Sequence, residues 1–281
     1  MLPQISIIIL LPLLEILTGS FARKYKKLHE ITICLISIVS LIFSISLPIS
    51  DVIYFIDFGF IKLKFMCDIY SYFFGILVNL VWILTNLYSY SYTSLSIHHH
   101  KINEFFKYLS LSIFCVAGIC YSGDLITTVI FATLLTLITS PLIVQNATKE
   151  AIKAREFYLI THLGSTIIFL IPAILVIWHF TGNLDYTKNN LLSSLNEDYL
   201  ASAILFFFIF GISKNCLMPF HNWIIKTTVA PTPVSGLLHS VAAVKSGSIM
   251  ILKVIIYIFG VDYIQKLTSN FFTGGWIFYL C

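Results

Sequence analysis

The stretch 211–253 reads GISKNCLMPFHNWIIKTTVAPTPVSGLLHSVAAVKSGSIMILK, and the interpretation of the whole chain starts from it. Its long apolar runs contain Lys214, His239 and Lys245, together with three prolines. A lysine at the centre of a membrane helix costs about 2.5–3.5 kcal/mol on insertion scales, so an intramembrane lysine is a functional candidate by default. The stretch therefore predicts an intramembrane site that can carry protons or cations.

The composition of the chain is that of a helical membrane protein. Of its 281 residues, 58% are hydrophobic and 11% are charged, whereas a soluble domain has about 25% charged residues. The apolar runs are near the length of about 20 residues that a membrane helix needs, and they lack the alternation of barrel strands. The net charge of +4 comes from basic residues in the loops between these runs. We therefore expect a lipid bilayer, and no nucleic acid, around this chain.

The cysteines and glycines give no sign of a cofactor. Six cysteines occur without a CxxC pair or a Cys/His ligand spacing, and no glycine-rich nucleotide loop is present. Small buried side chains are the better interpretation of these cysteines than disulfides or an iron–sulfur site. The three adjacent histidines 98–100 fall in a predicted loop, and sequence neighbours cannot share one helical face to bind a metal. We expect no metal and no cofactor on this chain, so a redox group would belong to another subunit.

The apolar runs predict an all-α architecture of eight full membrane helices and a short ninth one. The ninth run has about ten residues, too few to cross about 30 Å as a helix, so the sequence is expected to be interrupted in mid-span. The predicted runs are 3–19, 31–48, 68–93, 105–121, 124–145, 157–180, 199–225, 234–260 and one that starts near 271.

The charges of the loops predict an orientation with the N-terminus outside. Most basic residues then lie in cytoplasmic loops, as the positive-inside rule requires. These residues are Arg23, Lys24, Lys26, Lys27, Lys101, Lys107, Lys149, Lys153, Arg155 and Lys226. The outer loops hold Lys62, Lys64, Lys188 and Lys266.

Lys214 lies midway along the run 199–225, which makes it the leading candidate. Pro219 follows five residues later and has no N–H, so the carbonyl of Asn215 loses its helical partner. That carbonyl is expected to accept a hydrogen bond from Lys214 or to hold a water. Snorkelling is a poor alternative, because it operates near helix ends.

The run 234–260 carries the next two candidates. The prolines in 230–235 end one helix and begin another. His239 shares a helical face with Ser235, whereas Lys245 lies about 240° around an ideal helix from His239. The two can still border one water-filled path, particularly if Gly247 loosens the packing nearby. A histidine that simply packs against a neighbouring helix is the alternative for His239.

Four further polar residues have simpler explanations. Lys253 is near the outer end of its run and is expected to snorkel. Glu15 is expected to reach the interface, and Asn79 to make an interhelical hydrogen bond. Asp124 precedes a run, where a carboxylate favours the helix dipole.

The motifs in the opening stretch resemble a known family. The pattern K-x-x-x-x-P-x-H-x-W covers 214–223, and A-P-T-P-V-S-x-L-x-H-x-x-x-x-V-K-x-G covers 230–247. Both resemble the proton-pumping membrane subunits of respiratory complex I and, more closely, the large subunits of Mrp-type Na⁺/H⁺ antiporters. The segment 122–164 is similar to the fifth and sixth spans of that family, so the resemblance covers most of the chain.

The resemblance implies an arrangement of spans. Family members have about fourteen helices with two inverted five-helix repeats, each with a broken helix and a midplane lysine. By this resemblance, 1–104 holds three leading helices, 105–260 is the first repeat and a proton-conducting transporter domain, and 261–281 begins a truncated ninth helix.

The resemblance also implies residue roles. Lys214 matches the broken-helix lysine, His239 the central histidine of the next span, and Lys245 a lysine of the antiporter-like members. One position departs from the family: the glutamate expected to pair with the broken-helix lysine is replaced by Thr133, and no acid occurs from 125 to 148. Thr133 can form hydrogen bonds but cannot carry charge.

Two functional hypotheses remain. In the first, the chain is a multi-pass subunit, in a bacterial inner membrane, that relays H⁺, with Na⁺ as a second candidate ion, through Lys214, Asn215, the bend at Pro219, His239 and Lys245. Its partners would be other membrane subunits of an antiporter or NADH:quinone oxidoreductase-like complex, and an oxidoreductase label would describe that complex rather than this chain. In the second, the chain is a truncated, non-translocating scaffold or a remnant of such a subunit.

Overall fold

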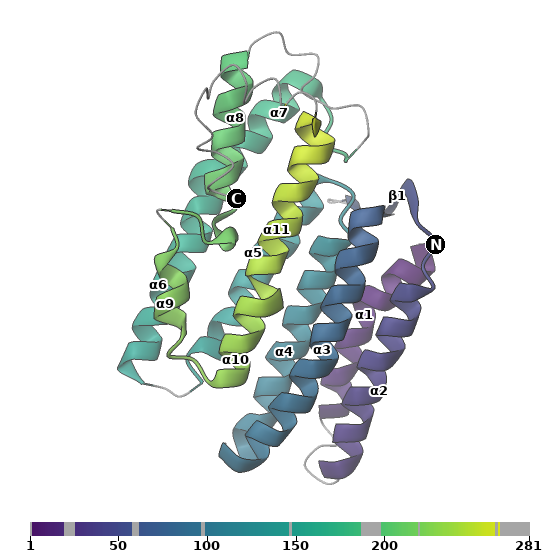
Figure 1. Ribbon diagram of the computed structural model, residues 1–281, viewed down its shortest axis with the longest axis vertical. Coiled ribbons are helices and arrows are strands. Elements are labelled where there is room, and N and C mark those ends of the chain that lie inside the picture. Colours follow the sequence, from purple (N-terminus) through teal and green to yellow (C-terminus); the bar gives the residue numbers. More distant parts are fainter. Residues whose placement is uncertain are drawn as a thin grey trace.

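The computed structural model describes residues 2–19, 26–57, 62–96, 99–145, 148–186, 198–218, 220–261 and 264, and most of them are helical (Figure 1). The first half contains α1 (Leu2–Gly19), α2 (Lys26–Ile45), β1 (Ser50–Asp57), β2 (Lys62–Cys67), α3 (Ile69–Ser96), α4 (His99–Cys120) and α5 (Leu125–Ile143). The second half contains α6 (Lys149–Ser165), η1 (Thr166–Leu170), α7 (Ile171–Thr181), α8 (Asp198–Gly211), η2 (Ser213–Asn215), α9 (Asn222–Thr227), α10 (Thr232–Leu237), η3 (Leu238–Ala242), α11 (Val244–Lys253) and η4 (Val254–Phe259).

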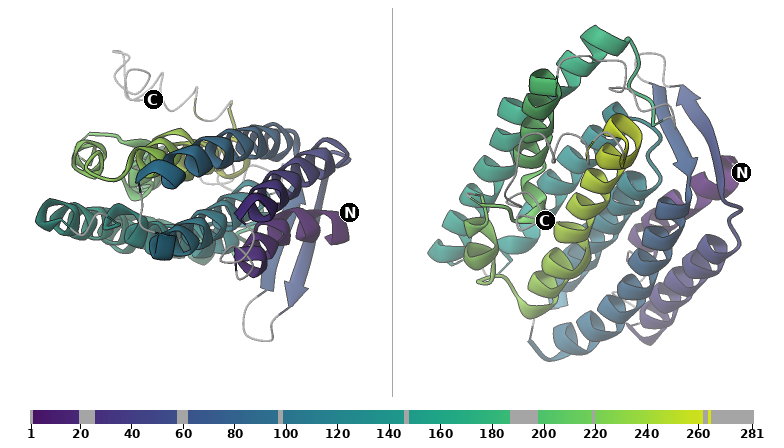
Figure 2. Two further views of the ribbon diagram at one scale, coloured as in Figure 1. Left: turned by 90° about the horizontal axis from the view of Figure 1, so that it is seen from below. Right: turned by 45° about the horizontal axis from the view of Figure 1, so that its top comes forward.

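The helices form one bundle whose neighbours in sequence are mostly neighbours in space. Helix α1 packs against α2 and α4, α2 packs against α3, and α4 packs against α5. The other side of α5 contacts α6, and α10 and α11 run past α3, α4 and α5 (Figures 1 and 2). The end of the bundle next to β1 and β2 is called here the hairpin end.

Several helices have the length and composition of membrane spans. Four described segments qualify: Ile69–Ser89, Leu125–Ile143, Lys149–Thr181 and Thr232–Phe259. They correspond to the predicted runs 68–93, 124–145, 157–180 and 234–260, which confirms a helical multi-pass membrane protein. Shorter apolar helices cover Gln4–Ile16, Ile31–Ile45 and Leu200–Gly211. The predicted ninth run lies outside the described residues.

The predicted loop between the second and third spans contains a β-hairpin that the sequence reading missed. Strands β1 and β2 pair antiparallel, with Tyr54 opposite Phe65 and Ile56 opposite Leu63. The hairpin joins the rest of the bundle through the N–H of Met66, which donates to the Tyr121 carbonyl over 2.8 Å. The signal was present in the sequence, since both strands have an ordinary length and contain β-branched or aromatic residues.

The apolar run 199–225 is not one continuous helix, because its middle is not helical. Helix α8 ends at Gly211, and α9 begins only at Asn222. Between them lie the single 3₁₀ turn η2 and Cys216, whose φ of 60° places it in the left-handed region. Pro219, which was expected to kink the helix, lies outside the described residues. The break begins before it because glycine, serine and asparagine at 211, 213 and 215 all favour non-helical backbone.

Close helix packing explains the position of Gly118. The Phe131 ring of α5 occupies the space where another residue would have its Cβ, so α4 and α5 approach each other closely there. A methyl group at Gly118 would overlap that ring, whereas nothing lies within 4 Å of a Cβ added at Gly164 of α6. The two glycines are therefore a matched pair for testing the packing.

We predict that Gly118→Ala lowers the thermal stability of the protein in detergent, since overpacking a core costs roughly 1–3 kcal/mol. Gly164→Ala is the control and should be neutral or slightly stabilising, because alanine favours a helix by about 1 kcal/mol over glycine. Unfolding followed by circular dichroism measures both, and equal midpoints for the two variants would contradict the α4–α5 packing.

Candidate functional site

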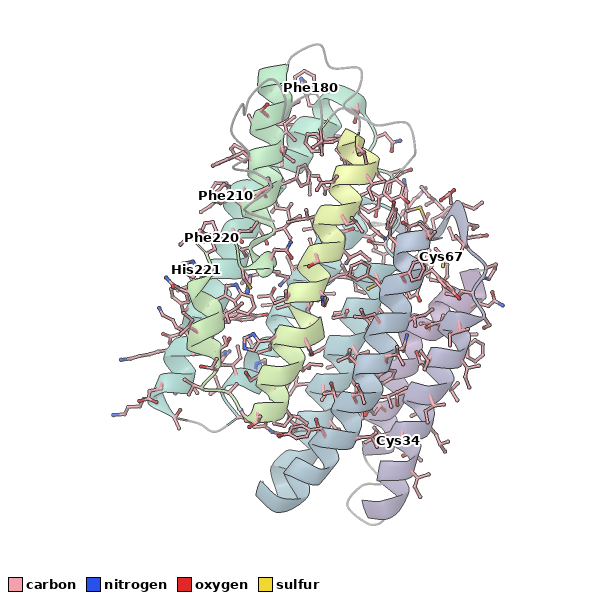
Figure 3. The ribbon with its side chains drawn as sticks, in the orientation of Figure 1. Cys34, Cys67, Phe180, Phe210, Phe220 and His221 are labelled. Atoms are coloured by element: carbon pink, nitrogen blue, oxygen red, sulfur yellow. The ribbon has the colours of Figure 1, made fainter. Side chains whose placement is uncertain are left out.

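The broken segment between α8 and α9 is held by close packing on two sides. A Cβ at Gly211 would lie 2.8 Å from the backbone nitrogen of Leu170, so only glycine lets α8 end against η1. The Phe220 ring packs against Phe169 and Phe210, at centroid distances of 6.1 and 6.2 Å (Figure 3). The break is therefore part of a packed core.

Lys214 points from this segment to α5. Its side chain is buried, and Nζ donates a hydrogen bond of 2.5 Å to Thr136 Oγ1. The Thr136 hydroxyl itself donates to the Ala132 carbonyl over 3.0 Å, which leaves its lone pairs free to accept from Lys214. The predicted bond from Lys214 to the Asn215 carbonyl is not the one the structure contains.

Thr133 lies one helical turn before Thr136 on α5. It is half-buried, and its hydroxyl donates to the carbonyls of Val129 and Ile130 in its own helix. The residue that contacts Lys214 on α5 is therefore Thr136, which the sequence reading did not single out.

Gly247 on α11 brings that helix against the broken segment. A Cβ at Gly247 would lie 2.6 Å from Asn215 Oδ1 and 3.0 Å from Lys214 Cβ. Ser248 Oγ donates to Asn215 Oδ1 over 3.3 Å. Gly247 thus permits close contact instead of loosening the packing, and Asn215 ties the segment to α11.

His239 lies near the broken segment but makes no described hydrogen bond. It belongs to the π-helical segment η3, and its ring stacks on Trp223 of α9 with centroids 6.2 Å apart. Both ring nitrogens are buried, and neither has a hydrogen-bond partner among the described residues. π-Helical segments occur frequently at functional sites, and a buried unpaired imidazole is unusual in a purely structural position.

Lys245 is not part of this buried cluster. Its side chain is exposed on α11, whereas Gly247 and Ser246 of the same helix are buried. The structure thus brings Lys214, Asn215 and His239 to one region and leaves Lys245 on the outer face of the same helix.

Helix α6 supplies polar groups that the sequence reading missed. His162 is buried, and its Nδ1 lies 2.8 Å from Oγ of Ser213, the residue before Lys214. Four residues earlier, the Tyr158 hydroxyl lies 2.9 Å from Thr139 Oγ1 on α5. The spacing of these two residues by one helical turn was the available signal in the sequence, since it places both on one face of the helix.

Lys253 forms a second buried site, near the hairpin end. The side chain is fully buried, and Nζ donates to the carbonyls of Cys120 and Ser122, each over 2.7 Å. The prediction that Lys253 snorkels is wrong, because the end of α4 and the residues after it cover the helix there.

Asp68 is the buried acid that accompanies Lys253. It acts electrostatically on the lysine, accepts a hydrogen bond from Tyr257 over 2.8 Å, and accepts two more from the hydroxyl and N–H of Ser71. The Ser71 hydroxyl also donates to the Cys120 carbonyl over 2.6 Å, so the acid and the lysine share one network.

The other polar residues discussed from the sequence have structural contacts. Glu15 is buried and accepts a hydrogen bond of 2.5 Å from Ser110, so it does not reach the interface. Asn79 bonds Ser44 of α2 over 2.8 Å, and Asp124 caps α5 through the N–H of Thr127, as predicted.

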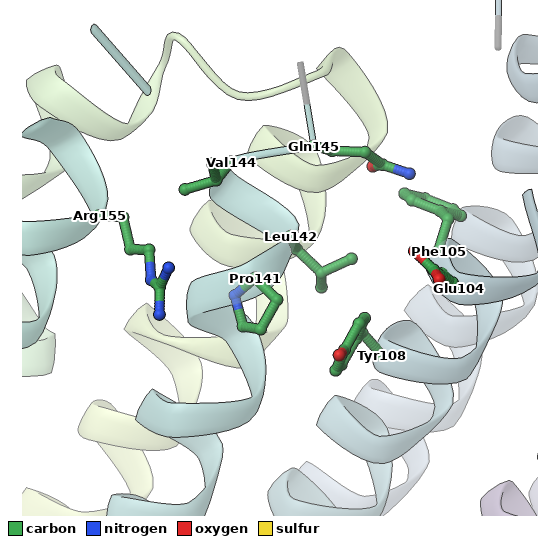
Figure 4. Close-up of a pocket in the computed structure, with 8 residues that line it drawn as sticks. All are labelled: Glu104, Phe105, Tyr108, Pro141, Leu142, Val144, Gln145 and Arg155. Atoms are coloured by element: carbon green, nitrogen blue, oxygen red, sulfur yellow. The ribbon is translucent and has the colours of Figure 1, made fainter. Parts of the chain in front are cut away.

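The surface pockets lie away from these sites. One pocket of about 300 Å³ is found where α4, α5 and α6 meet, with Glu104, Pro141 and Arg155 in its wall (Figure 4). Another of about 340 Å³ lies at the hairpin end beside Lys64 and Asp185, which form an ion pair of 2.5 Å. Neither wall contains Lys214, His239 or Lys245. The described residues contain no group of three or more His, Cys, Asp or Glu that could hold a metal.

Comparisons with known proteins identify relatives of this chain. Residues 122–276, more than half of the chain, match the family described as "NADH:quinone oxidoreductase/Mrp antiporter, TM". A protein of Staphylococcus haemolyticus (strain JCSC1435), named as antiporter subunit mnhA2, is 29% identical over 200 residues, which are 69% of this chain and 24% of the relative. A protein of the same name from Staphylococcus saprophyticus is 28% identical over 222 residues, 75% of this chain and 27% of the relative. The chain therefore spans about a quarter of the length of these relatives.

Two solved structures share the fold. The Mrp complex from Dietzia sp. DQ12-45-1b contains a chain that aligns with a TM-score of 0.76 and 16% identity, over 95% of this chain and 30% of that one. An archaeal respiratory membrane complex, the membrane-bound sulfane sulfur reductase, contains another with a TM-score of 0.74 and 18% identity, over 95% of this chain and 56% of that one. At these identities the likeness shows the fold alone.

The Lys253 network leads to a prediction about stability. Lys253→Met should cost roughly 1–3 kcal/mol, because it leaves the carbonyls of Cys120 and Ser122 buried without their donor. Lys245→Met removes an exposed lysine from the same helix and should change stability by no more than about 0.5 kcal/mol. Chemical unfolding of the purified variants measures the difference, and a Lys253→Met protein as stable as Lys245→Met would show that the network contributes little.

Proposed function

Because this chain belongs to the NADH:quinone oxidoreductase/Mrp antiporter family, we propose that it is a proton- or cation-translocating membrane subunit of an Mrp-like antiporter or an NADH:quinone oxidoreductase-like complex. The observation that carries the proposal is Lys214, a buried lysine in a broken helix that donates to a neutral hydroxyl. Ionisable groups within membrane segments mark proton and ion paths.

The proposed mechanism is a relay of protons along the broken segment. Lys214 takes up and releases the proton, and its bond to Thr136 holds the amine in place in either charge state. His239 is the next group, since both its buried nitrogens are free to exchange protons. Lys245 belongs to the relay only if further helices cover the exposed face of α11. Asn215 positions the segment through Ser248, and the proline at 219 has no N–H to give to a helix.

The partners we propose are other membrane subunits. The relatives are named as antiporter subunits, and the solved neighbours come from the Mrp complex and an archaeal respiratory membrane complex. The carried ion is H⁺, with Na⁺ as a second candidate, and a redox cofactor would belong to another subunit. The arrangement of 105–260 as one five-helix repeat, after three leading helices in 1–104, is part of the same proposal.

The proposed orientation puts the hairpin end outside a bacterial inner membrane. The opposite end carries Lys107, Lys149, Lys153 and Arg155, and the positive-inside rule places such a cluster in the cytoplasm. The N-terminus is then outside.

A flux measurement tests the proposal. In sealed membrane vesicles that contain the chain with its partner subunits, Lys214→Ala should reduce proton flux, followed with a pH-sensitive dye, by roughly 10²-fold or more. Lys226→Ala, which removes a lysine exposed on the surface of α9, is the control and should keep wild-type flux. Unchanged flux in Lys214→Ala would refute the relay and favour a non-translocating scaffold.

A further inference from the structure

The charge of Lys214 has no carboxylate close by to balance it. Among the described residues, Lys214 forms no ion pair with a carboxylate, and its hydrogen bond goes to the hydroxyl of Thr136. The position on α5 where the family has a glutamate is Thr133, and its neighbour Thr136 is likewise neutral. A second group that exchanges protons with Lys214 therefore has to be a base that is neutral when unprotonated, such as an imidazole.

His162 is the base that the structure places beside the broken segment. Its side chain is 2% exposed, and its Nδ1 lies 2.8 Å from Ser213 Oγ, on the residue next to Lys214. Ser165 Oγ lies 2.7 Å from Ser213 Oγ and 3.1 Å from the His162 carbonyl oxygen, so the two serines and the histidine form one buried polar cluster.

The Nε2 atom of His162 is buried and has no hydrogen-bond partner among the described residues. Buried polar atoms are nearly always paired, and the exceptions concentrate where protons are exchanged or a ligand binds. Two aromatic rings pack against the imidazole: Tyr158 at a centroid distance of 4.5 Å and Trp223 at 4.8 Å. The ring is thus held between Ser213 on Nδ1 and an Nε2 atom that has no partner among the described residues.

Hydroxyl groups link Lys214 to Tyr158, whose ring contacts His162. Tyr158 lies one turn from His162 on α6 and interacts through its hydroxyl with both Thr139 and Thr136. Thr136 is the acceptor of Lys214 Nζ. Among the described residues, the ionisable groups near His162 are Lys214, Tyr158 and, across Trp223, His239.

We propose that His162 is the second proton-carrying residue of this site, and that His162 and Lys214 hold one excess proton between them in place of a lysine–carboxylate pair. In the transfer, an N–H bond of the Lys214 ammonium breaks and an N–H bond of the imidazole forms, so the positive charge moves with the proton. Two positive charges, on Lys214 and on an imidazole hydrogen-bonded to the residue before it, repel strongly in a medium of low dielectric constant, which restricts the pair to one proton. The inference rests on the proposed function, because it adds a residue to the same relay.

The test is proton flux in the same vesicles, normalised to the amount of protein in the membrane. His162→Asn keeps a polar atom near the position of Nδ1 for Ser213 but cannot titrate, and it should lose flux by roughly 10²-fold. His162→Gln places its amide near the position of Nε2 instead, and it should lose flux to the same extent. It is the second variant to measure if His162→Asn does not assemble. His179→Asn, at an exposed histidine of α7, is the matched control and should keep wild-type flux.

A rescue variant separates a proton carrier from a structural histidine. Thr133→Glu places a carboxylate one turn from Thr136, on the face of α5 that meets Lys214. If His162 carries protons, the double variant Thr133→Glu/His162→Asn should have a flux at least about tenfold higher than that of His162→Asn alone. Failure of this rescue, or wild-type flux in His162→Asn while Lys214→Ala is inactive, would overturn the role of His162 and leave the proposed function standing. Wild-type flux in Lys214→Ala would instead overturn the proposed function.

Discussion

The Lys214 amine lies inside an apolar bundle, where it needs a hydrogen-bond acceptor and space free of other side chains. The surrounding structure provides both. The hydroxyl of Thr136 accepts the hydrogen bond, and the break between α8 and α9 carries the lysine to α5. Gly211 and Gly247 let η1 and α11 close over the break. Unpaired backbone is tolerated at this depth only where protein or water satisfies it, so the packing and the polar site depend on each other.

The segment Thr232–Phe259 connects this site to the hairpin end. It passes His239 at Trp223, then the contact of Gly247 with Asn215, and finally the Lys253 network. Its two π-helical segments, η3 and η4, interrupt the regular α-helical spacing. The buried Lys253 and Asp68 fix one end of this segment against α3 and α4, whereas His239, toward its other end, has no hydrogen-bond partner among the described residues. This contrast separates a structural charge network from a site suited to proton exchange.

The sequence predicted part of this structure. Apolar runs located the spans, and the lysine and prolines in 211–253 predicted a broken helix with a buried Lys214. The partner of Lys214 could not be predicted, because the contact between η2 and Thr136 depends on how two distant segments pack. Lys253 was misjudged because its position near a helix end does not show that α4 covers it. His162 was missed because no sequence motif marks a single histidine in an apolar run. Its role is indicated by the contact with Ser213, which is 51 residues away in sequence.

The central claim is that Lys214 and Thr136 act as one unit, and a double-mutant cycle on proton flux tests it most directly. Flux is measured in vesicles with Lys214→Ala, Thr136→Val and the double variant, each normalised to the amount of inserted protein. If the hydroxyl acts through the lysine, the double variant should be no slower than Lys214→Ala alone, because coupled residues give non-additive effects. If Thr136→Val reduces flux by the same factor in the wild type and in Lys214→Ala, the two residues act independently, and this result would contradict the account.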